Sequence, residues 1–182
     1  ALLAYPGALT RSRLGATPIS GDLTALALAL GSQDPYTQGH SRRVAEYAAR
    51  MAARLGMGAE ERELVRTGGL LHDIGKVGIS RKLRANCNTR LTAGMRAEIR
   101  RHPEIGFNFL RALGVSAPVV DCVRYHHERP DGSGYPYGLR SEAIPRSAQI
   151  ISVADCFDAL TTDRPYQKGR QREHAFAIME RM

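Results

Sequence analysis

The hydrophobic residues of this chain recur at steps of three and four positions, the period of an amphipathic helix. The clearest stretch spans residues 44–55 and stops before Gly56, a residue suited to the end of a helix. His40 lies four positions before this stretch and is therefore expected on the buried face of the same helix. A second helix is predicted from about residue 59, with His72 and Asp73 at its end.

Further helices are predicted at about 92–101, 103–113, 116–127 and 145–161, with a last one from about 171. In the second of these, Phe109, Leu110 and Leu113 are expected to face inward. The helix at 145–161 carries apolar residues on nearly all sides, so it should be buried. Residues 76–91 are predicted to be an irregular loop, and residues 128–144 a long glycine- and proline-rich loop of the kind that is usually functional. We find no convincing strand alternation, so the predicted fold is an all-α bundle.

The first 21 residues lack a clean period and are interpreted as a linker or the tail of an upstream element. We expect one domain over residues 22–182, which is an ordinary domain length. Because the chain begins with Ala1 and ends inside a helical pattern at Met182, we expect a longer parent protein and a truncated C-terminal border. The longest apolar stretch, residues 23–30, is too short to span a membrane.

The composition limits which compartment and which binding partners are expected for the chain. Its three cysteines have no metal-type spacing and imply no disulfide framework, which fits a reducing compartment, so we expect a cytoplasmic protein. The net charge of +8 suits a polyanionic ligand, although a basic solvated surface is the simpler explanation of the charge alone. The basic residues occur as short scattered pairs, so binding to a nucleic-acid polymer is not expected.

The first candidate for chemistry is the adjacent imidazole and carboxylate of His72 and Asp73. At the end of a buried helix both side chains can reach one metal ion, and a carboxylate can bridge two ions through its separate oxygens. For the dipeptide alone, an N–H···O pair that closes the helix end is the alternative. The other histidines favour the metal site.

Four more of the six histidines fall at predicted helix ends or on an apolar helix face, namely His40, His102, His126 and His127. A lone histidine of this kind is usually a satisfied core or surface residue. Four of them, together with His72, favour a shared site instead. His174 lies in a polar stretch, is expected to face solvent and is assigned no role.

Asp155 lies in the otherwise apolar helix at 145–161, where an ionised carboxylate is costly without a partner. A metal ion is the most economical partner, and an arginine salt bridge is the alternative. Nitrogen and carboxylate ligands without thiolates suit Fe, Mn or Zn ions. Two ions about 3.5–4 Å apart are a standard device for phosphoester cleavage, because they activate a bridging water as hydroxide. Lys76 is either a cation that stabilises the transition state beside them or an ordinary exposed lysine.

These residues stand in segments 34–44, 70–76, 102–103, 126–128, 131–136, 144–145, 153–161 and 163–166. In these segments the chain resembles the HD-GYP domain, a bacterial subgroup of the HD phosphohydrolases. Gly134-Tyr135-Pro136 is the stretch that gives the subgroup the last three letters of its name. The resemblance covers about residues 22–182.

The resemblance implies a bundle of about seven helices that hydrolyses cyclic di-GMP to linear pGpG or to GMP in bacterial second-messenger signalling. It implies that the ligands of two metal ions are His40, His72, Asp73, His102, His126, His127 and Asp155, with Asp73 bridging. It further implies that Asp73 and Lys76 act in catalysis, with Lys76 contacting the phosphate. The implied substrate contacts are Lys76, Gly134, Tyr135, Pro136, Arg164 and Lys168.

Some positions depart from the family pattern. Members that hold three metal ions carry a glutamate four residues before the first ligand histidine, and Tyr36 stands there, so two ions are implied. Residues 79–95 also differ from the usual loop, with Asn86-Cys87-Asn88 and Gly94-Met95 in place of a Lys-Pro-Gly turn and an acidic pair. These changes spare every implied ligand but bear on substrate affinity and loop conformation.

The altered segment 79–95 motivates a second hypothesis, a non-catalytic module. Such a module would bind cyclic di-GMP, or a GGDEF-type diguanylate cyclase, through residues 128–144. A third hypothesis keeps the enzyme class and changes the substrate to another cyclic dinucleotide or a nucleotide phosphomonoester. We also expect an upstream sensor or receiver domain in the full-length protein.

Overall fold

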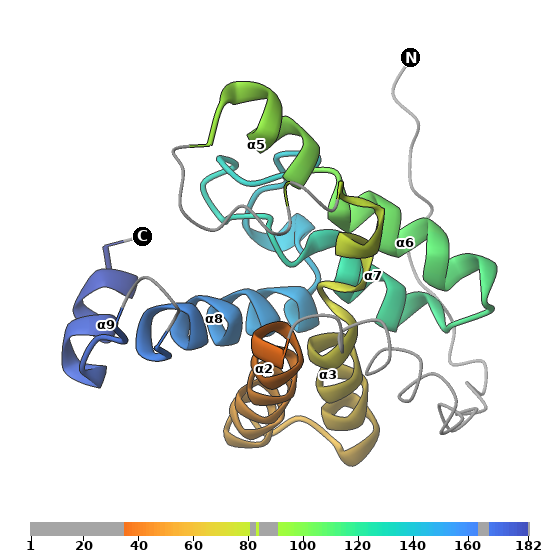
Figure 1. Cartoon of the computed structure of the whole chain (residues 1–182). Coiled ribbons are helices and arrows are strands. Elements are labelled where there is room, and N and C mark those ends of the chain that lie inside the picture. The colour runs from red at the N-terminus through yellow and green to blue at the C-terminus, as the bar shows by residue number, and fades with distance from the viewer. Residues whose placement is uncertain (1–34, 81–82, 84–90, 164–167, 182) are drawn as a thin grey trace.

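The computed structural model describes residues 35–80, 83, 91–163 and 168–181, and these residues form a bundle of helices (Figure 1). The α-helices are α2 (Pro35–Arg54), α3 (Ala59–Leu71), α5 (Ala93–Ile99), α6 (His102–Ala112), α7 (Ala117–Tyr125), α8 (Arg146–Thr161) and α9 (Arg172–Met179). Two short 3-10 helices, η1 (Ile74–Gly78) and η2 (Ser141–Ala143), lie in the connections. The described residues contain no strand, and an isolated antiparallel bridge joins Asp131 to Arg140. The all-α prediction is confirmed.

Local signals in the sequence set the helix ends. Gly56 follows α2 and Gly114 follows α6 with φ angles of 74° and 72°, a conformation that glycine adopts without a steric penalty. Thr92 caps α5, because its hydroxyl oxygen accepts the backbone N–H of Met95 at 3.2 Å. These ends agree with the predicted ones.

Two burial predictions are wrong. Leu113 is 46% exposed, because it is the C-cap residue of α6 and lies past the inward-facing Leu110. The helix α8 is not covered on all sides, since Val153 is 43% exposed. The helices α2, α3, α7 and α9 contact α8, and they leave part of its surface exposed to solvent.

Several predictions fall on parts of the chain that the structure does not describe. The predicted linker 1–21 and the apolar segment 23–30 lie outside the described residues, as does most of the predicted loop 76–91. The first residues of that loop belong to η1 and are therefore regular. Among the described helices, none is long and apolar enough to cross a bilayer.

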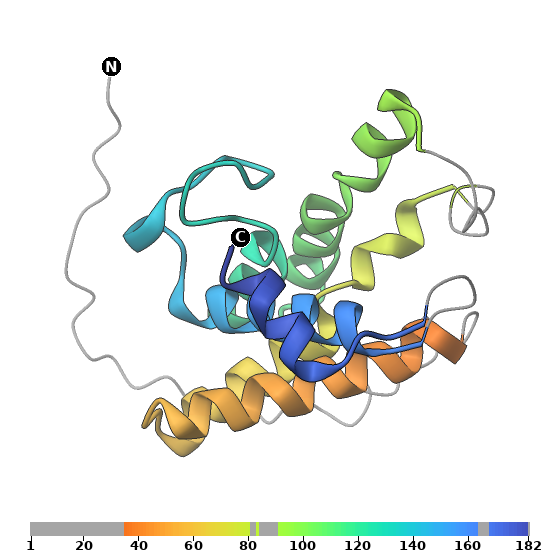
Figure 2. The ribbon, with the colours of Figure 1, turned by 90° about the vertical axis from the view of Figure 1, so that its left-hand side faces the viewer.

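Two buried clusters share the central helix α3. The first joins α2, α3 and α8 and includes Val44 and Ile151. The second joins the end of α3 to α6 and α7 and includes Leu71, Leu110 and Val123. Figures 1 and 2 show α2 and α3 side by side, with α8 packed against both. Because α3 contributes residues to both clusters, packing fixes the position of its C-terminal end, which carries His72 and Asp73.

A close crossing of two backbones brings the end of α3 to the start of α6. A β-carbon at Gly75 would lie 1.9 Å from the carbonyl oxygen of His102, so only glycine fits there. On the facing side, a β-carbon at Gly106 would lie 2.8 Å from a methyl carbon of Val123. The crossing therefore places Asp73, two residues before Gly75, beside His102.

Candidate metal centre

Seven polar side chains meet in the bundle: His40 of α2, His72 and Asp73 after α3, His102 of α6, His126 and His127 after α7, and Asp155 of α8. Most of them leave the main chain at or next to a helix end, where the chain can turn toward a common point. His127 and Asp155 are partly buried, and the other five are buried. All seven are the residues that the family resemblance implied as metal ligands.

The first group of side chains consists of His40, His72 and Asp73, with Asp155 beside it. The Oδ2 atom of Asp73 lies 3.8 Å from Nε2 of His40 and 3.3 Å from Nε2 of His72. Asp155 Oδ1 lies 3.2 Å from Nε2 of His40. Two imidazole nitrogens and two carboxylates therefore face one small volume.

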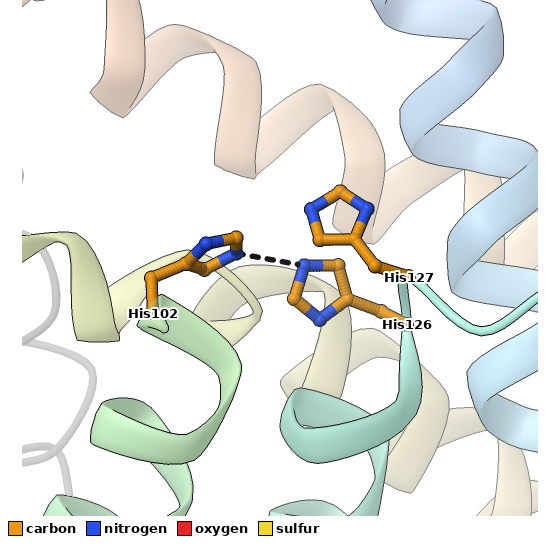
Figure 3. Close-up of side chains that lie close together, drawn as sticks. All are labelled: His102, His126 and His127. Carbon is orange, nitrogen blue, oxygen red and sulfur yellow. Dashed lines mark hydrogen bonds between the residues drawn. The ribbon is translucent and has the colours of Figure 1, made fainter. Parts of the chain in front are cut away.

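The second group consists of His102, His126 and His127 (Figure 3). The Nε2 atoms of His102 and His126 lie 3.2 Å apart. The ring of His127 is centred 4.1 Å from the ring of His126 and 5.0 Å from the ring of His102. Figure 3 shows the three rings turned toward one another from two separate chain segments.

Asp73 belongs to the first group and also reaches the second. Its Oδ2 atom faces His40 and His72, and its Oδ1 atom lies 3.4 Å from Nε2 of His102 in the second group. Among the buried side-chain atoms of the described residues, Oδ1 of Asp73 and Nε2 of His72 have no hydrogen-bond partner. Buried polar atoms without a partner are costly, so an ion between the groups would satisfy both. The donor set fits divalent cations that accept nitrogen and oxygen ligands.

Hydrogen bonds on the far side of each ring fix the histidine orientation. The Nδ1–H groups of His72, His102 and His126 donate to the carbonyl oxygens of Gly69, Ile99 and Val123 at 2.7, 2.8 and 2.8 Å. A ring that donates through Nδ1 presents the lone pair of Nε2, the form in which histidine binds a metal ion. The three Nε2 atoms therefore point inward as acceptors.

The electrostatics of the second group favour neutral imidazoles. Burial, followed by the neighbouring imidazoles, holds the pKa of His126 well below its ordinary value. Burial and the proximity of His102 lower the pKa of His127 to about 3, and burial lowers the pKa of His102. Neutral imidazoles compete with protons less and bind cations more readily.

In the first group, neighbouring charges and burial shift the pKa values in opposite directions. Burial alone would lower the pKa of His40, but its hydrogen bonds to Asp155 and Asp158 raise it to about 9. Burial alone would raise the pKa of Asp73, but Lys76 and His72 hold it well below its ordinary value. Without a cation, the protonated His40 ring provides the positive charge that these carboxylates require.

A family model described as the HD domain matches residues 25–182 of the chain. The chain belongs to the HD domain family. The HD domain of this chain is 36% identical over 158 residues to the 3'3'-cGAMP-specific phosphodiesterase 3 of Vibrio cholerae. This match covers 87% of this chain and 34% of that protein. It is 37% identical over 162 residues to the cyclic di-GMP phosphodiesterase response regulator RpfG of Xanthomonas campestris, over 86% of this chain and 42% of that protein. The resemblance to HD-GYP proteins is confirmed.

A third relative is the cyclic di-GMP phosphodiesterase PA4108 of Pseudomonas aeruginosa, 40% identical over 151 residues, or 82% of this chain and 36% of that protein. The HD domain thus spans less than half the length of these relatives. In structure it is similar to the HD domain of the phosphodiesterase PgpH from L. monocytogenes, with a TM-score of 0.63, 21% identity and coverage of 85% of this chain and 80% of that chain. This likeness shows the fold.

The HD domain also contains a buried carboxylate that has no role predicted from the sequence. Asp158 is fully buried, and its Oδ2 atom accepts Nδ1–H of His40 at 2.7 Å. Arg43 donates to both oxygens of Asp158 at 2.6 and 3.0 Å. These contacts lower the pKa of Asp158 to about 2, although burial acts to raise it. The available signal was its position three residues after Asp155, which places both carboxylates on one face of α8.

A second buried carboxylate, Glu128, holds the long loop of this HD domain. It is 2% exposed and accepts the backbone N–H of Tyr137 at 2.7 Å and of Leu139 at 2.9 Å. A β-carbon at Gly134 would lie 2.4 Å from the nitrogen of Arg129, so the loop folds closely on its own first residues. The long loop 128–144 is therefore ordered by residues adjacent to His127.

The loop places an aromatic ring against the histidines. The ring of Tyr135 stacks on that of His127, with centroids 4.7 Å apart and an angle of 26° between the planes. Beside this stack lies a pocket of about 480 Å³, whose lining includes His127, Gly134, Tyr135 and Asp155. The pocket thus reaches His127 of the second group and Asp155, which lies beside the first group.

The other residues that were predicted to contact substrate lie in different environments, and one of them is not described by the structure. The ammonium of Lys76 donates to Oδ2 of Asp73 at 2.6 Å, and its side chain is 41% exposed. Pro136 follows Tyr135 in the loop and is partly buried. Lys168 is exposed beyond α8, and Arg164 lies outside the described residues. His174, to which no role was assigned, is exposed on α9 as predicted.

Proposed function

We propose that this HD domain is a metal-dependent phosphodiesterase that hydrolyses cyclic di-GMP. In this proposal one divalent ion is held by His40, His72 and Asp155, and a second by His102, His126 and His127, with Asp73 shared between them. The observation that carries the proposal is the position of Asp73, which turns one carboxylate oxygen toward each group of imidazoles. Tyr36, at the position of the third-metal glutamate, supports a count of two.

Ions bound there would lower the pKa of a water molecule and neutralise charge on the phosphate oxygens. The side chains of the protein prepare this chemistry. The anchored imidazoles keep their Nε2 lone pairs directed inward and need no reorientation during turnover. The half-exposed Lys76 holds its ammonium beside Asp73, where it can also donate to a phosphate oxygen. Attack of water on one phosphorus breaks one P–O bond and opens the ring to pGpG, and a second hydrolysis gives GMP.

The names of the relatives support the substrate class. Two of the three relatives described above are named cyclic di-GMP phosphodiesterases, and the third is named a 3'3'-cGAMP-specific phosphodiesterase. The second candidate substrate is therefore 3'3'-cGAMP, a cyclic dinucleotide with one adenine in place of guanine. Because one relative is named a response regulator and is much longer than this chain, we also propose a receiver domain upstream.

The proposal is tested with the Asp73→Asn variant, which keeps the shape of the side chain and removes its charge. We expect turnover of cyclic di-GMP to fall by more than ~100-fold, since loss of even an outer partner of a metal ligand costs 10–100-fold. Metal content, measured by elemental analysis on the same sample, should fall as well. Glu142→Gln, which removes an exposed carboxylate from η2, is the matched control and should leave both quantities unchanged.

Undiminished turnover by Asp73→Asn with full metal content would contradict the proposed centre. If the unaltered protein cleaves 3'3'-cGAMP in place of cyclic di-GMP, the proposed metal centre stands and the proposed substrate is wrong. Binding of cyclic dinucleotides without cleavage under Fe, Mn and Zn would favour the non-catalytic module.

A further inference from the structure

Two arginines with no assigned role line the pocket beside the histidines. Arg100 is the C-cap residue of α5, and Arg129 follows two residues after His127. Both line the pocket of about 480 Å³ that also contains His127 and Asp155. Figures 1 and 2 show α5 and the loop after α7 on the same side of α8. One cavity thus joins the candidate metal centre to two guanidinium groups from separate segments.

A stack of side chains positions Arg100. Its guanidinium carbon lies 5.1 Å from the centre of the Tyr135 ring, and Tyr135 in turn stacks on His127 at 4.7 Å. A cation over an aromatic ring is attracted by the ring and can still donate its N–H groups to a ligand. The ring of Tyr135 therefore contacts both His127 and the guanidinium of Arg100, and it links this cation to the histidines.

Arg129 brings a second cation to the same cavity. Its side chain is 35% exposed, and its Nε atom forms an ion pair with Oδ1 of Asp131 at 3.9 Å. Among the described residues that line the cavity, Asp155 is the one carboxylate, and its Oδ1 atom already lies 3.2 Å from Nε2 of His40. The described lining therefore carries two guanidinium groups and one carboxylate.

A cyclic dinucleotide carries two phosphodiester groups, and only one of them can occupy the metal centre at a time. The other enters the protein with a full negative charge, which is costly to bury without partners. Arginine pairs with phosphate through two parallel N–H···O bonds. We propose that Arg100, assisted by Arg129, binds the phosphate that is not being cleaved. This inference rests on the proposed function and extends it to the part of the substrate remote from the reaction.

The test compares substrates with one and two phosphates. Bis(p-nitrophenyl) phosphate has a single phosphodiester, whereas cyclic di-GMP has two. For Arg100→Ala we expect kcat/KM on cyclic di-GMP to fall at least ~10-fold further than on bis(p-nitrophenyl) phosphate, mainly through KM, as a charged hydrogen bond is lost. Arg129→Ala should show the same selective loss. Arg101→Ala, which removes an exposed neighbouring arginine outside the cavity, is the control.

Inhibition of the p-nitrophenyl reaction separates recognition of phosphate from recognition of base. Cyclic di-GMP and cyclic di-AMP should both lose affinity by the same factor in Arg100→Ala, because they share both phosphates. A loss confined to cyclic di-GMP means that Arg100 contacts guanine, and an equal loss on both substrates places it at the cleaved phosphate. Either result overturns the inference, as does an Arg100→Ala variant that matches Arg101→Ala. If the unaltered protein neither binds nor cleaves cyclic dinucleotides, the proposed function fails first.

Discussion

At the scale of single residues, the histidines of the centre differ in what holds them. The rings of His72, His102 and His126 donate to main-chain carbonyl oxygens, which no substitution can remove. The ring of His40 donates to a side chain, Asp158. Its orientation therefore depends on a residue that is not itself a candidate ligand.

Replacement of Asp158 should weaken metal binding at the first group. In Asp158→Ala, His40 loses its acceptor and Arg43 its carboxylate partner. We expect the affinity for one of the bound ions to fall 10–100-fold, as for other outer-shell partners, and the free energy of unfolding to fall by about 3 kcal/mol. Calorimetric titration with Mn²⁺ or Zn²⁺ and chemical denaturation measure these two effects.

The control for Asp158 is Glu46→Ala, which removes an exposed carboxylate that accepts from Arg50 on α2. Exposed ion pairs contribute at most about 1 kcal/mol, and this one should not affect metal binding. If Asp158→Ala unfolds more easily but binds both ions with unchanged affinity, its role is confined to packing and does not include orientation of His40.

The roles of some single residues could not be predicted from the sequence. The family segments contain Asp158 and Glu128, yet the pattern of residue types does not tell which carboxylate faces a metal ion and which faces a backbone amide. That distinction depends on the rotation of α8 and on the path of the loop. Arg100 lacked any signal, because its role depends on a stack with Tyr135 from a segment 35 positions later.

At the scale of elements, most boundaries were predictable because they depend on local chemistry. Glycine with positive φ and a threonine cap mark helix ends in the sequence as they do in the structure. Burial was less predictable, as Leu113 and Val153 demonstrate. A periodic pattern identifies an apolar face but not the neighbouring elements that cover it.

The long loop offers a prediction at this scale. Glu128→Ala removes a buried carboxylate that accepts the backbone N–H groups of Tyr137 and Leu139. We expect a loss of about 3 kcal/mol in the free energy of unfolding, since both amides lose a charged acceptor. Amide hydrogen exchange at Tyr137 and Leu139 should accelerate more than exchange within α2 or α3.

An exposed acidic residue of the same connection provides the comparison for Glu128. Glu142→Ala lies in η2 and should change neither the stability nor the exchange rates of those two amides. Faster exchange throughout the molecule in Glu128→Ala, without preference for the loop, would contradict a local tether.

At the scale of the whole molecule, the fold class and the convergence of seven polar residues could be anticipated from the sequence. The histidines at helix ends and the buried Asp155 favoured a shared site, and the family resemblance implied the full set of seven ligands, because no local signal tells how close α2 and α8 come to the end of α3. What the sequence could not supply is the arrangement at the centre, in which the backbone crossing at Gly75 brings Asp73 between two groups.

The buried histidines predict how the stability of the metal-free protein depends on pH. The pKa of His127 is lowered to about 3, so its contribution is present above the unfolded value of about 6.5 and is lost as the pH falls toward 3. The pKa of His40 is raised to about 9, so its contribution is present below about 6.5 and is lost as the pH rises through 9. Stability should peak near pH 6.5, with slopes of at most about 1.4 kcal/mol per pH unit for each proton.

Urea denaturation in the presence of a chelator, repeated from pH 4 to pH 9, measures this curve. The His40→Gln variant should lose the decline above pH 6.5, whereas His174→Gln, at an exposed position, should retain it. A metal-free protein whose stability keeps rising between pH 6.5 and pH 9 would contradict the raised pKa of His40.

In the proposed centre, the shared carboxylate of Asp73 would make the two halves thermodynamically dependent. A cation in either half would draw electron density from the same side chain and repel a cation in the other half. Such coupling is reciprocal, so each occupant would weaken the affinity for its neighbour by the same factor. Filling would then be stepwise, and under metal scarcity a half-loaded form would accumulate.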